Sequence, residues 1–224
     1  MRKMPPAAWT DTAESLPLLT MRGVTKTFAR GLARASRRTI AVSNVDFDVF
    51  PGDVILVTGD VGAGKTTLLQ CACNILRPDD GIVSRAAAAY VPAVPVYYPF
   101  LTLRDVLSLR GASPSTVEAL LTAFDILSFA KGAVANLPPP ALKRLAIAES
   151  LVRGPSVLLI DTGTFDVPSC TTLSAALAAG AAVVVAARNG SSIARMATRI
   201  ICLDEGRVSR MFSSGQSRVA ERIH

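Results

Sequence analysis

The sequence contains few of the side chains that build zinc centres and redox sites. It has a single histidine, His224, and four cysteines among its 224 residues. The spacing of the cysteines fits neither a zinc site nor a redox pair, so we expect neither. We interpret the cysteines as reduced, buried thiols of a cytosolic protein. They are Cys71, Cys73, Cys170 and Cys202.

A hydrophobic run long enough to cross a bilayer is also missing. The longest nearly uncharged apolar stretch covers residues 175–187, whereas a membrane-spanning helix needs roughly 20 residues. Gly180 divides this stretch, which favours a helix end followed by a buried strand. Residues 1–20 have no continuous apolar run, which argues against a signal peptide. We therefore expect a soluble protein that reaches a membrane only through a partner.

Aromatic side chains are scarce, at 5% of the sequence, although the formal net charge is +7. Four arginines cluster in one short segment, at Arg30, Arg34, Arg37 and Arg38. No aromatic-rich motif accompanies this charge, so we expect a solvated basic surface and no nucleic-acid partner. Apolar residues are abundant, at half of the sequence, and the length suits one compact domain with room for a small inserted subdomain.

Short apolar runs alternate with helical patterns along most of the chain. An uninterrupted apolar run is typical of a strand buried on both faces of a parallel sheet, and an alternating run of a half-buried strand. Buried strands are expected at residues 54–57, 157–160 and 182–187, a half-buried strand at 40–50, a hairpin tip at 29–39, and helices at 65–76 and over much of 103–148. This order predicts an α/β fold around a parallel sheet.

The most specific motif lies between the first of these buried strands and the helix that follows it. It fits the phosphate-loop pattern G-x-x-x-x-G-K-[ST]. Glycines in such a loop let several N–H groups point at one phosphate, and the helix N-terminus adds its positive end. We expect Lys65 to reach the β- and γ-phosphates of a nucleotide, and the Thr66 hydroxyl to ligate Mg²⁺. The expected ATP-binding residues of the loop are Gly59, Asp60, Val61, Gly62, Ala63, Gly64, Lys65, Thr66 and Thr67.

From residue 18 to about residue 208, the chain resembles the ATP-binding subunit of ABC transporters. Landmarks of that family occur in the family's order at residues 24–28, 41–52, 90–93, 99–106, 142–148, 157–161 and 199–208. The resemblance implies an ABC-type P-loop NTPase fold with a mainly parallel core sheet, a small antiparallel β subdomain and a shortened helical subdomain at about residues 100–150. It also implies a tail over residues 1–17 and an ATP-binding domain over residues 18–224.

Two further site residues follow from the resemblance. Phe28 ends the family's opening strand, where an aromatic ring stacks on adenine; simple core packing is the alternative. Asp161 ends the strand called Walker B, where an aspartate binds Mg²⁺ through water; a strand-end turn residue is the alternative. Asp166 lies near the aspartate of the family's D-loop. The implied cofactors are ATP and Mg²⁺.

Several positions depart from the family's catalytic pattern. The signature L-S-G-G-Q is replaced by LPPPA at residues 137–141, and proline has no N–H to offer a γ-phosphate. Ala93 replaces the glutamine of the glutamine loop, and Thr162 replaces the catalytic glutamate. A threonine cannot act as a base near neutral pH. The switch histidine falls at Arg188 or Asn189.

These departures predict an ABC-type subunit that binds ATP with little or no hydrolysis. As an enzyme, the isolated chain is expected to be a weak or inactive ATPase. The resemblance implies two partners, a second ABC ATP-binding subunit in a heterodimer and a membrane permease. The chain would then lie at the cytoplasmic face of the membrane, held there through the permease.

Family members dock their permease on the segment that corresponds to residues 96–110. Tyr97, Tyr98 and Phe100 are candidate contacts there, with core packing as the alternative. Two other functions remain open. One is an active transport ATPase that uses substitutes such as Thr162 or Arg188, or a partner's residues. The other is a nucleotide-gated structural or regulatory protein unconnected to transport.

Overall fold

The computed structural model describes residues 16–30, 37–163 and 168–213. Its strands are β1 (Leu19–Arg30), β2 (Arg37–Val49), β3 (Val54–Thr58), β4 (Asp80–Arg85), β5 (Ala88–Val91), β6 (Val157–Asp161), β7 (Ala182–Ala186), β8 (Arg199–Asp204) and β9 (Arg207–Ser213). Its α-helices are α1 (Lys65–Ala72), α2 (Leu103–Leu109), α3 (Pro114–Ala123), α4 (Pro139–Leu151) and α5 (Cys170–Ala178). Short 3-10 helices occur at Leu127–Phe129, Val134–Asn136 and Ser192–Arg195.

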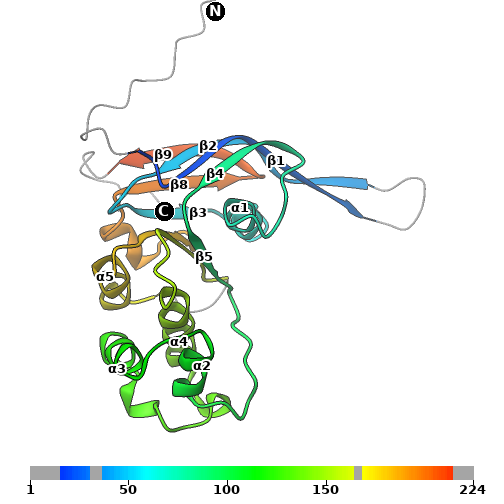
Figure 1. The fold of residues 1–224 in the computed structure, drawn as a ribbon. Coiled ribbons are helices and arrows are strands. Elements are labelled where there is room, and N and C mark those ends of the chain that lie inside the picture. The colour runs from blue at the N-terminus through cyan, green and yellow to red at the C-terminus, as the bar shows by residue number, and fades with distance from the viewer. Residues whose placement is uncertain (1–15, 31–36, 164–167, 214–224) are drawn as a thin grey trace, which may run out of the picture.

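The strands form two sheets (Figure 1). The larger one has six strands in the order β5-β6-β7-β3-β8-β9, and only the pairing of β9 with β8 is antiparallel. The smaller one has three antiparallel strands in the order β2-β1-β4. The predicted fold class, an ABC-type α/β domain with a mainly parallel core sheet and a small antiparallel β subdomain, is confirmed.

The six-stranded sheet is buried on both faces. Every residue of β3, β6 and β7 is buried, which explains their uninterrupted apolar runs. Ile55 and Val57 point into a core shared with α1 and the three-stranded sheet, whereas Leu56 points into a core shared with α4 and α5. Strand side chains alternate between faces, so these two cores fix which loops emerge at the carboxyl edge of the sheet.

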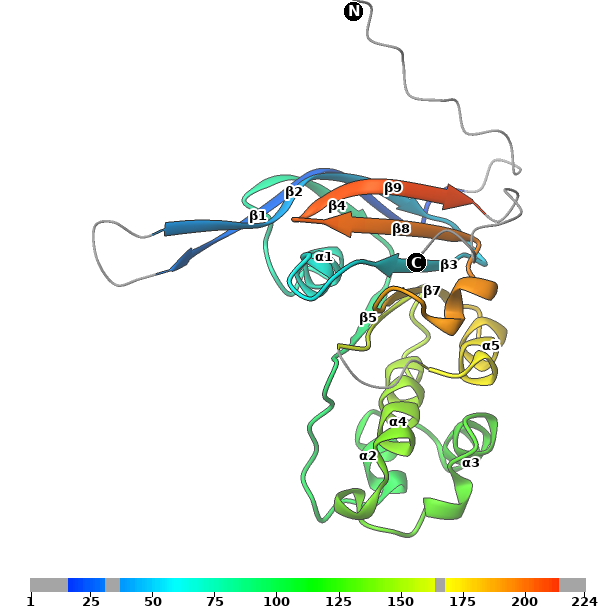
Figure 2. The ribbon, with the colours of Figure 1, turned by 180° about the vertical axis from the view of Figure 1, so that it is seen from behind.

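Helices α2, α3 and α4 form an arm that extends from the six-stranded sheet, on the side away from the three-stranded sheet (Figures 1 and 2). Thr102 and Asp105 form a capping box at the start of α2, and Ser113 caps α3. The arm meets the core through α4, which packs against β5, β6 and α5. Residues 92–101 connect β5 to α2 and run along one side of this junction.

Three sequence expectations need correction. The exposed strand β4 was not predicted from the sequence. Helix α1 was expected to run to residue 76, but it ends at Ala72, because Asn74 adopts a positive φ of 59° soon after it. Cys170 is exposed, so the expectation of buried thiols was wrong for it; Cys71 is buried, and Cys73 and Cys202 are half-buried. Within the described ranges, no helix is long and apolar enough to span a membrane.

Candidate functional site

The phosphate loop connects β3 to α1 at the carboxyl edge of the six-stranded sheet. Its last residue, Gly64, has a φ of 97° and caps α1. A Cβ atom at Gly64 would lie 2.0 Å from the carbonyl oxygen of Ala41, and one at Gly59 would lie 2.2 Å from that of Leu203. Because backbone occupies both places, only glycine fits at either position. The neighbouring strands β2 and β8 therefore hold the loop in its anion-binding shape.

Lys65 lies across the inside of this loop. Its Nζ atom donates hydrogen bonds of 2.7 Å to the carbonyl oxygens of Gly59 and Asp60. Burial lowers the pKa of Lys65, against the attraction of Asp161 and Asp60, and the nearby positive charge of Arg188 lowers it further. The ammonium group thus stands where it can meet an anion cradled by the loop. Of the other predicted loop residues, Val61 is exposed, Ala63 is buried and Thr67 is half-buried.

The residues predicted to hold Mg²⁺ lie together. The Thr66 hydroxyl donates to Asp161 Oδ2 at 2.6 Å, and the amide of Gly163 donates to Asp161 Oδ1 at 2.9 Å. Magnesium prefers oxygen ligands and usually takes one or two from the protein, with phosphates and water supplying the others. In the described part of the chain, no cluster of three or more acidic, histidine or cysteine side chains offers a cage. A hydroxyl paired with a carboxylate beside a phosphate loop fits Mg²⁺ bound together with a nucleotide.

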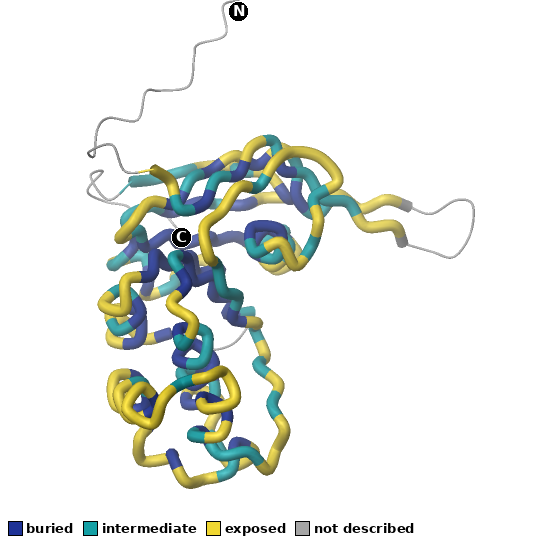
Figure 3. Tube along the Cα trace, viewed as in Figure 1, coloured by how far each residue is buried: buried dark blue, intermediate teal, exposed yellow. Residues whose placement is uncertain are grey.

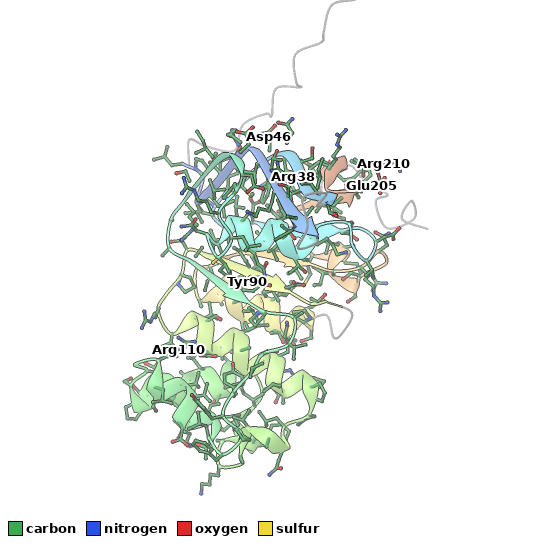
Figure 4. All side chains as sticks on the ribbon, turned by 90° about the vertical axis from the view of Figure 1, so that its right-hand side faces the viewer. Arg38, Asp46, Tyr90, Arg110, Glu205 and Arg210 are labelled. Carbon is green, nitrogen blue, oxygen red and sulfur yellow. The ribbon has the colours of Figure 1, made fainter. Side chains whose placement is uncertain are left out.

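Tyr90 is a site residue that sequence reasoning missed. Its hydroxyl lies 3.3 Å from Asp161 Oδ2 and donates to it, so both carboxylate oxygens have donors. Burial and the charge of Asp161 raise the pKa of Tyr90 to about 12, which keeps the hydroxyl protonated. Figure 4 shows Tyr90 between the sheet and the helical arm. Only its position at the end of β5, next to β6, gave a signal in the sequence.

Thr162, at the position predicted for the family's catalytic glutamate, is bonded to the backbone of the neighbouring strand β7. It is buried, and both its hydroxyl and its amide donate to the carbonyl oxygen of Ala186 on β7, at 2.8 and 3.1 Å. The side chain therefore helps to join the ends of two strands. A hydroxyl held in this way has no proton acceptor function near a nucleotide.

The two candidate switch positions behave differently. Asn189 contacts the phosphate loop and the strand before it: the Thr58 hydroxyl donates to Asn189 Oδ1 at 2.8 Å, and Asn189 Nδ2 donates to Asp60 Oδ1 at 3.4 Å. Arg188 is exposed, and its charge reaches Lys65. Asn189 thus supports the loop, and Arg188 adds positive potential beside it. Asp166, the D-loop candidate, lies outside the described residues.

Helix α4 begins with the three prolines that are predicted to stand in place of the family signature. Pro138 is the N-cap residue, and Pro139 and Pro140 fill the first two helical positions. The first N–H groups of a helix are the ones left free for an anion, and prolines have none. Ala141 keeps an N–H, whereas the amide of Leu142 donates to the carbonyl oxygen of Pro138. All three prolines are exposed, so α4 presents a rigid apolar surface in place of donors.

Ala93 brings only a methyl group and no polar side chain to the site, but a lysine reaches the same place from α4. Lys143 Nζ donates to the carbonyl oxygens of Pro92 at 2.6 Å, Ala93 at 3.3 Å and Asp161 at 2.5 Å. The side chain is only 6% exposed. The sequence gave no sign of this contact, because a lysine on a helix usually faces solvent.

Phe28 lies on the hairpin of β1 and β2 and is 40% exposed. Its ring centroid is 5.8 Å from Lys26 Nζ, which in turn bonds Asp79. A separate open cavity of about 1000 Å³ adjoins the phosphate loop only at Gly62. Its other walls are Arg38, Thr39, Ile40, Asp204, Glu205, Arg207, Val208 and Ser209. The cavity therefore includes Gly62 of the predicted ATP-binding residues, but not the ring of Phe28, Lys65, Thr66 or Asp161.

Residues 92–101 carry a row of exposed apolar side chains. Exposure alternates along much of this segment (Figure 3), and Val94, Val96, Tyr98 and Phe100 are each more than 60% exposed. The rings of Tyr98 and Phe100 stack with their centroids 5.8 Å apart. We call these four residues the outer ridge. Tyr97 points the other way, and its hydroxyl donates to Glu149 Oε2 on α4 at 2.6 Å.

The family model of the ABC transporter matches residues 42–164, more than half of the chain. The chain belongs to the ABC transporter family, as a nucleotide-binding domain. The zinc import ATP-binding protein ZnuC of Brucella melitensis is 32% identical over 126 residues, which cover 54% of this chain and 42% of that protein. ZnuC of Rhizobium meliloti is 31% identical over 155 residues, which cover 66% of this chain and 48% of that protein. The chain spans about half the length of the curated relatives it matches.

Solved structures share the fold. A dimeric ATP-binding cassette in a post-hydrolysis state with ADP and Pi has a TM-score of 0.74 and 23% identity, covering 87% of this chain and 98% of the other. The protein cbiO1 of Clostridium perfringens, part of the ABC transporter complex cbiONQ, has a TM-score of 0.73 and 20% identity, covering 89% of each chain.

Proposed function

We propose that the chain is a nucleotide-holding subunit of an ABC transporter complex, which binds Mg²⁺ and ATP and hydrolyses ATP little or not at all. One observation carries the proposal. The Thr66 hydroxyl and the Asp161 carboxylate lie together beside the phosphate loop, whereas Thr162 offers no carboxylate and its hydroxyl is bonded to Ala186. Binding and hydrolysis use different groups at this site, and only the first set is present.

The expected loss of turnover is large. A positioned general base contributes about 10²- to 10⁴-fold to a rate. A preorganised donor to developing charge contributes a further factor of roughly 10² to 10³. These factors do not simply multiply. Even so, Thr162 and Pro138–Pro140 stand in place of separate groups, so restoring one does not restore the other.

Partners follow from family membership and from the outer ridge. Contiguous exposed apolar side chains usually mark an interaction surface, and the outer ridge lies where family members dock a membrane permease. We infer a permease partner and a second ATP-binding subunit whose catalytic residues are intact. The chain would then lie at the cytoplasmic face of the membrane, peripheral through the permease. Lys65, Thr66 and Asp161 would hold a nucleotide that the second subunit covers.

An active ATPase is the second candidate function, and one observation favours it. The charge of Arg188 lies close enough to Lys65 to lower its pKa, so it adds positive potential where a γ-phosphate would lie. A cation can stabilise charge that develops in the transition state, but it does not remove a proton from water. The candidate therefore still needs a base from a partner subunit.

The test combines binding with turnover. Titration with Mg-ATP should give saturable binding to the isolated chain, and Lys65→Ala should weaken it at least tenfold because a charge-assisted contact to phosphate is lost. Turnover should stay well below about 1 s⁻¹, the low end for typical enzymes. A rate above that value would overturn the proposal and would mean that the chain supplies its own base. Absence of any nucleotide binding would leave a structural role.

The partners are tested by purification from membranes. An affinity-tagged chain should retain a permease and a second ATP-binding subunit, and a variant with serine at Val96 and Tyr98 should lose the permease. Serine substitution on an exposed segment leaves the fold intact. Retention of the permease by that variant would exclude the outer ridge as its docking surface.

A further inference from the structure

Lys143 is the buried charged group that the proposed nucleotide chemistry does not use. It lies in the second turn of α4, and its ammonium group reaches out of the arm into the core. An ammonium group has three N–H donors, and each of them has a carbonyl oxygen at Pro92, Ala93 or Asp161. In the described part of the chain, no carboxylate forms an ion pair with it.

Placing a lysine here has a cost that its contacts must offset. Burial lowers the pKa of Lys143 to about 8, and the charge of Asp161 opposes this shift. Hydrogen bonds from a charged donor are worth more than neutral ones, and they are lost together if the side chain is removed. The three carbonyl oxygens belong to two segments far apart in sequence, the start of the loop after β5 and the end of β6.

A second contact from the same helix holds the same loop. Glu149, less than two turns further along α4, accepts a hydrogen bond from Tyr97 and pairs with Arg110 at the end of α2. Figure 4 shows Arg110 near the end of the arm that lies toward the core. Helix α4 therefore grips residues 92–101 at two points, Ala93 and Tyr97. The outer ridge residues Val94 and Val96 lie between these two points in the sequence, and both are exposed.

We propose that Lys143 is a positioning residue that fixes both Asp161 and the loop of residues 92–101 to the helical arm. The carboxylate that would hold Mg²⁺ and the ridge that faces a partner then belong to one rigid unit. Lys143 holds Asp161 by its backbone carbonyl, while Thr66, Tyr90 and Gly163 hold its carboxylate. The part of this inference that concerns Mg²⁺ rests on the proposed nucleotide binding; the part that concerns the loop does not.

The loop is tested first, on the nucleotide-free full chain, by limited digestion with chymotrypsin. Phe100 is an exposed cleavage site, whereas Pro99 protects the bond after Tyr98, and cleavage requires the loop to leave its support. Lys143→Met keeps a long unbranched side chain and removes the donors. Lys131→Met makes the same change at an exposed lysine of the arm. Cleavage after Phe100 should be at least about tenfold faster in Lys143→Met than in Lys131→Met.

Equal cleavage rates in the two variants would overturn the proposal. Lys143→Gln serves where Lys143→Met does not fold, because an amide supplies two donors at the same place. The cleavage rate of Lys143→Gln should lie between those of the wild type and of Lys143→Ala, in which no donor holds the loop. If Lys143→Gln and Lys143→Ala were both cleaved at the wild-type rate, the contacts of Lys143 would not be what holds the loop.

Asp161 is tested by the ratio of ATP affinities with and without Mg²⁺. A general loss of folding would weaken both affinities alike, whereas a displaced Asp161 weakens only the one with Mg²⁺. In Lys143→Met this ratio should fall by about tenfold, with the Mg²⁺-free affinity within about twofold of Lys131→Met. Parallel loss of both affinities would overturn the positioning role. If the wild type binds no nucleotide, the proposed function fails, and the digestion still decides whether Lys143 holds the loop.

Discussion

Two helix starts in this molecule have been given opposite properties. Helix α1 begins after Gly64, and each of its first residues carries a backbone N–H, with Lys65 standing beside the loop. Helix α4 begins with Pro138, Pro139 and Pro140, which have no N–H groups. In both helices the peptide dipoles place a positive end of similar size at the N-terminus. The two helix starts therefore differ in their N–H donors and not in their dipoles.

The same substitution has different consequences for folding and for binding. Proline is well suited to the first turn of a helix, because its fixed φ matches the helix and the missing N–H would be unpaired there. Helix α4 accordingly forms and buries Leu145 and Ile147 in the core. An anion at its start, by contrast, would find almost no donor. The fold accommodates the prolines at α4, whereas any side chain at Gly64, before α1, would collide with the backbone of β2.

The largest effect is expected at the start of α1. Gly64→Ala places a Cβ atom 2.0 Å from the Ala41 carbonyl oxygen at a φ of 97°, so β2 and the loop must separate. We expect a loss of more than about 3 kcal/mol in the free energy of unfolding, together with loss of nucleotide binding. Urea unfolding and a Mg-ATP titration measure the two.

Gly62→Ala is the matched control, because its φ is also positive, at 88°, but nothing lies within 4 Å of the added Cβ. It should cost only about 1 kcal/mol of conformational strain. If the two variants were equally stable, the close packing of β2 against the phosphate loop would not be what selects glycine.

The next effect concerns α4. Replacing Pro138, Pro139 and Pro140 by Ser, Gly and Gly restores donors at the helix start. With Thr162 unchanged, bound ATP should persist and hold two copies together through these donors. We expect ATP-dependent self-association to strengthen at least tenfold, since hydrogen bonds to charged groups are worth about 1.5–3 kcal/mol. Sedimentation velocity with and without Mg-ATP measures it.

Pro114→Gly is the control for the loss of proline itself, because Pro114 also stands at the start of a helix, α3. It should lower stability by about 0.4–1 kcal/mol, as removal of a well-placed proline does, and leave association unchanged. An association that does not respond to ATP in the triple variant would mean that donors at α4 do not reach a neighbouring nucleotide.

Local signals in the sequence carried most of the fold. Strand β3 and the phosphate loop could be predicted because an apolar run, glycines and a lysine lie within a dozen residues. Strand β4 could not, because it lies at a sheet edge with only Val83 half-buried, so no alternation appears. The length of the β1–β2 hairpin was also underestimated, since Ala29 and Arg38 pair within the region expected to be its tip.

The candidate site divides in the same way. The proximity of Thr66 and Asp161 could be predicted, because each ends a recognisable motif. Lys143 could not, because its partner Asp161 lies 18 residues away and its partner Ala93 lies 50 residues away. Only the packing of α4 against β5 and β6 creates those contacts. Side chains that support a motif from a distant element leave no spacing in the sequence.

The smallest effect is expected at Thr162, and it bears on whether a substitute residue performs catalysis. The hydroxyl donates to the Ala186 carbonyl oxygen, which also accepts from the Thr162 amide. Thr162→Val removes one of these two bonds in a buried place and keeps the shape of the side chain. We expect a loss of about 1 kcal/mol in the free energy of unfolding, and no change in nucleotide affinity or in residual turnover.

Thr162→Ser is the control, since it keeps the hydroxyl and loses only a methyl group. Because the backbone bond to Ala186 remains in both variants, Thr162→Val against the wild type reports the loss of the hydroxyl bond, and Thr162→Ser against the wild type reports the loss of the methyl group. Denaturant unfolding gives the stability, and turnover is measured at saturating Mg-ATP. If Thr162→Val abolished a turnover that Thr162→Ser retained, the hydroxyl would act in the hydrolysis of ATP. The site at the start of α1 would then perform catalysis as well as binding.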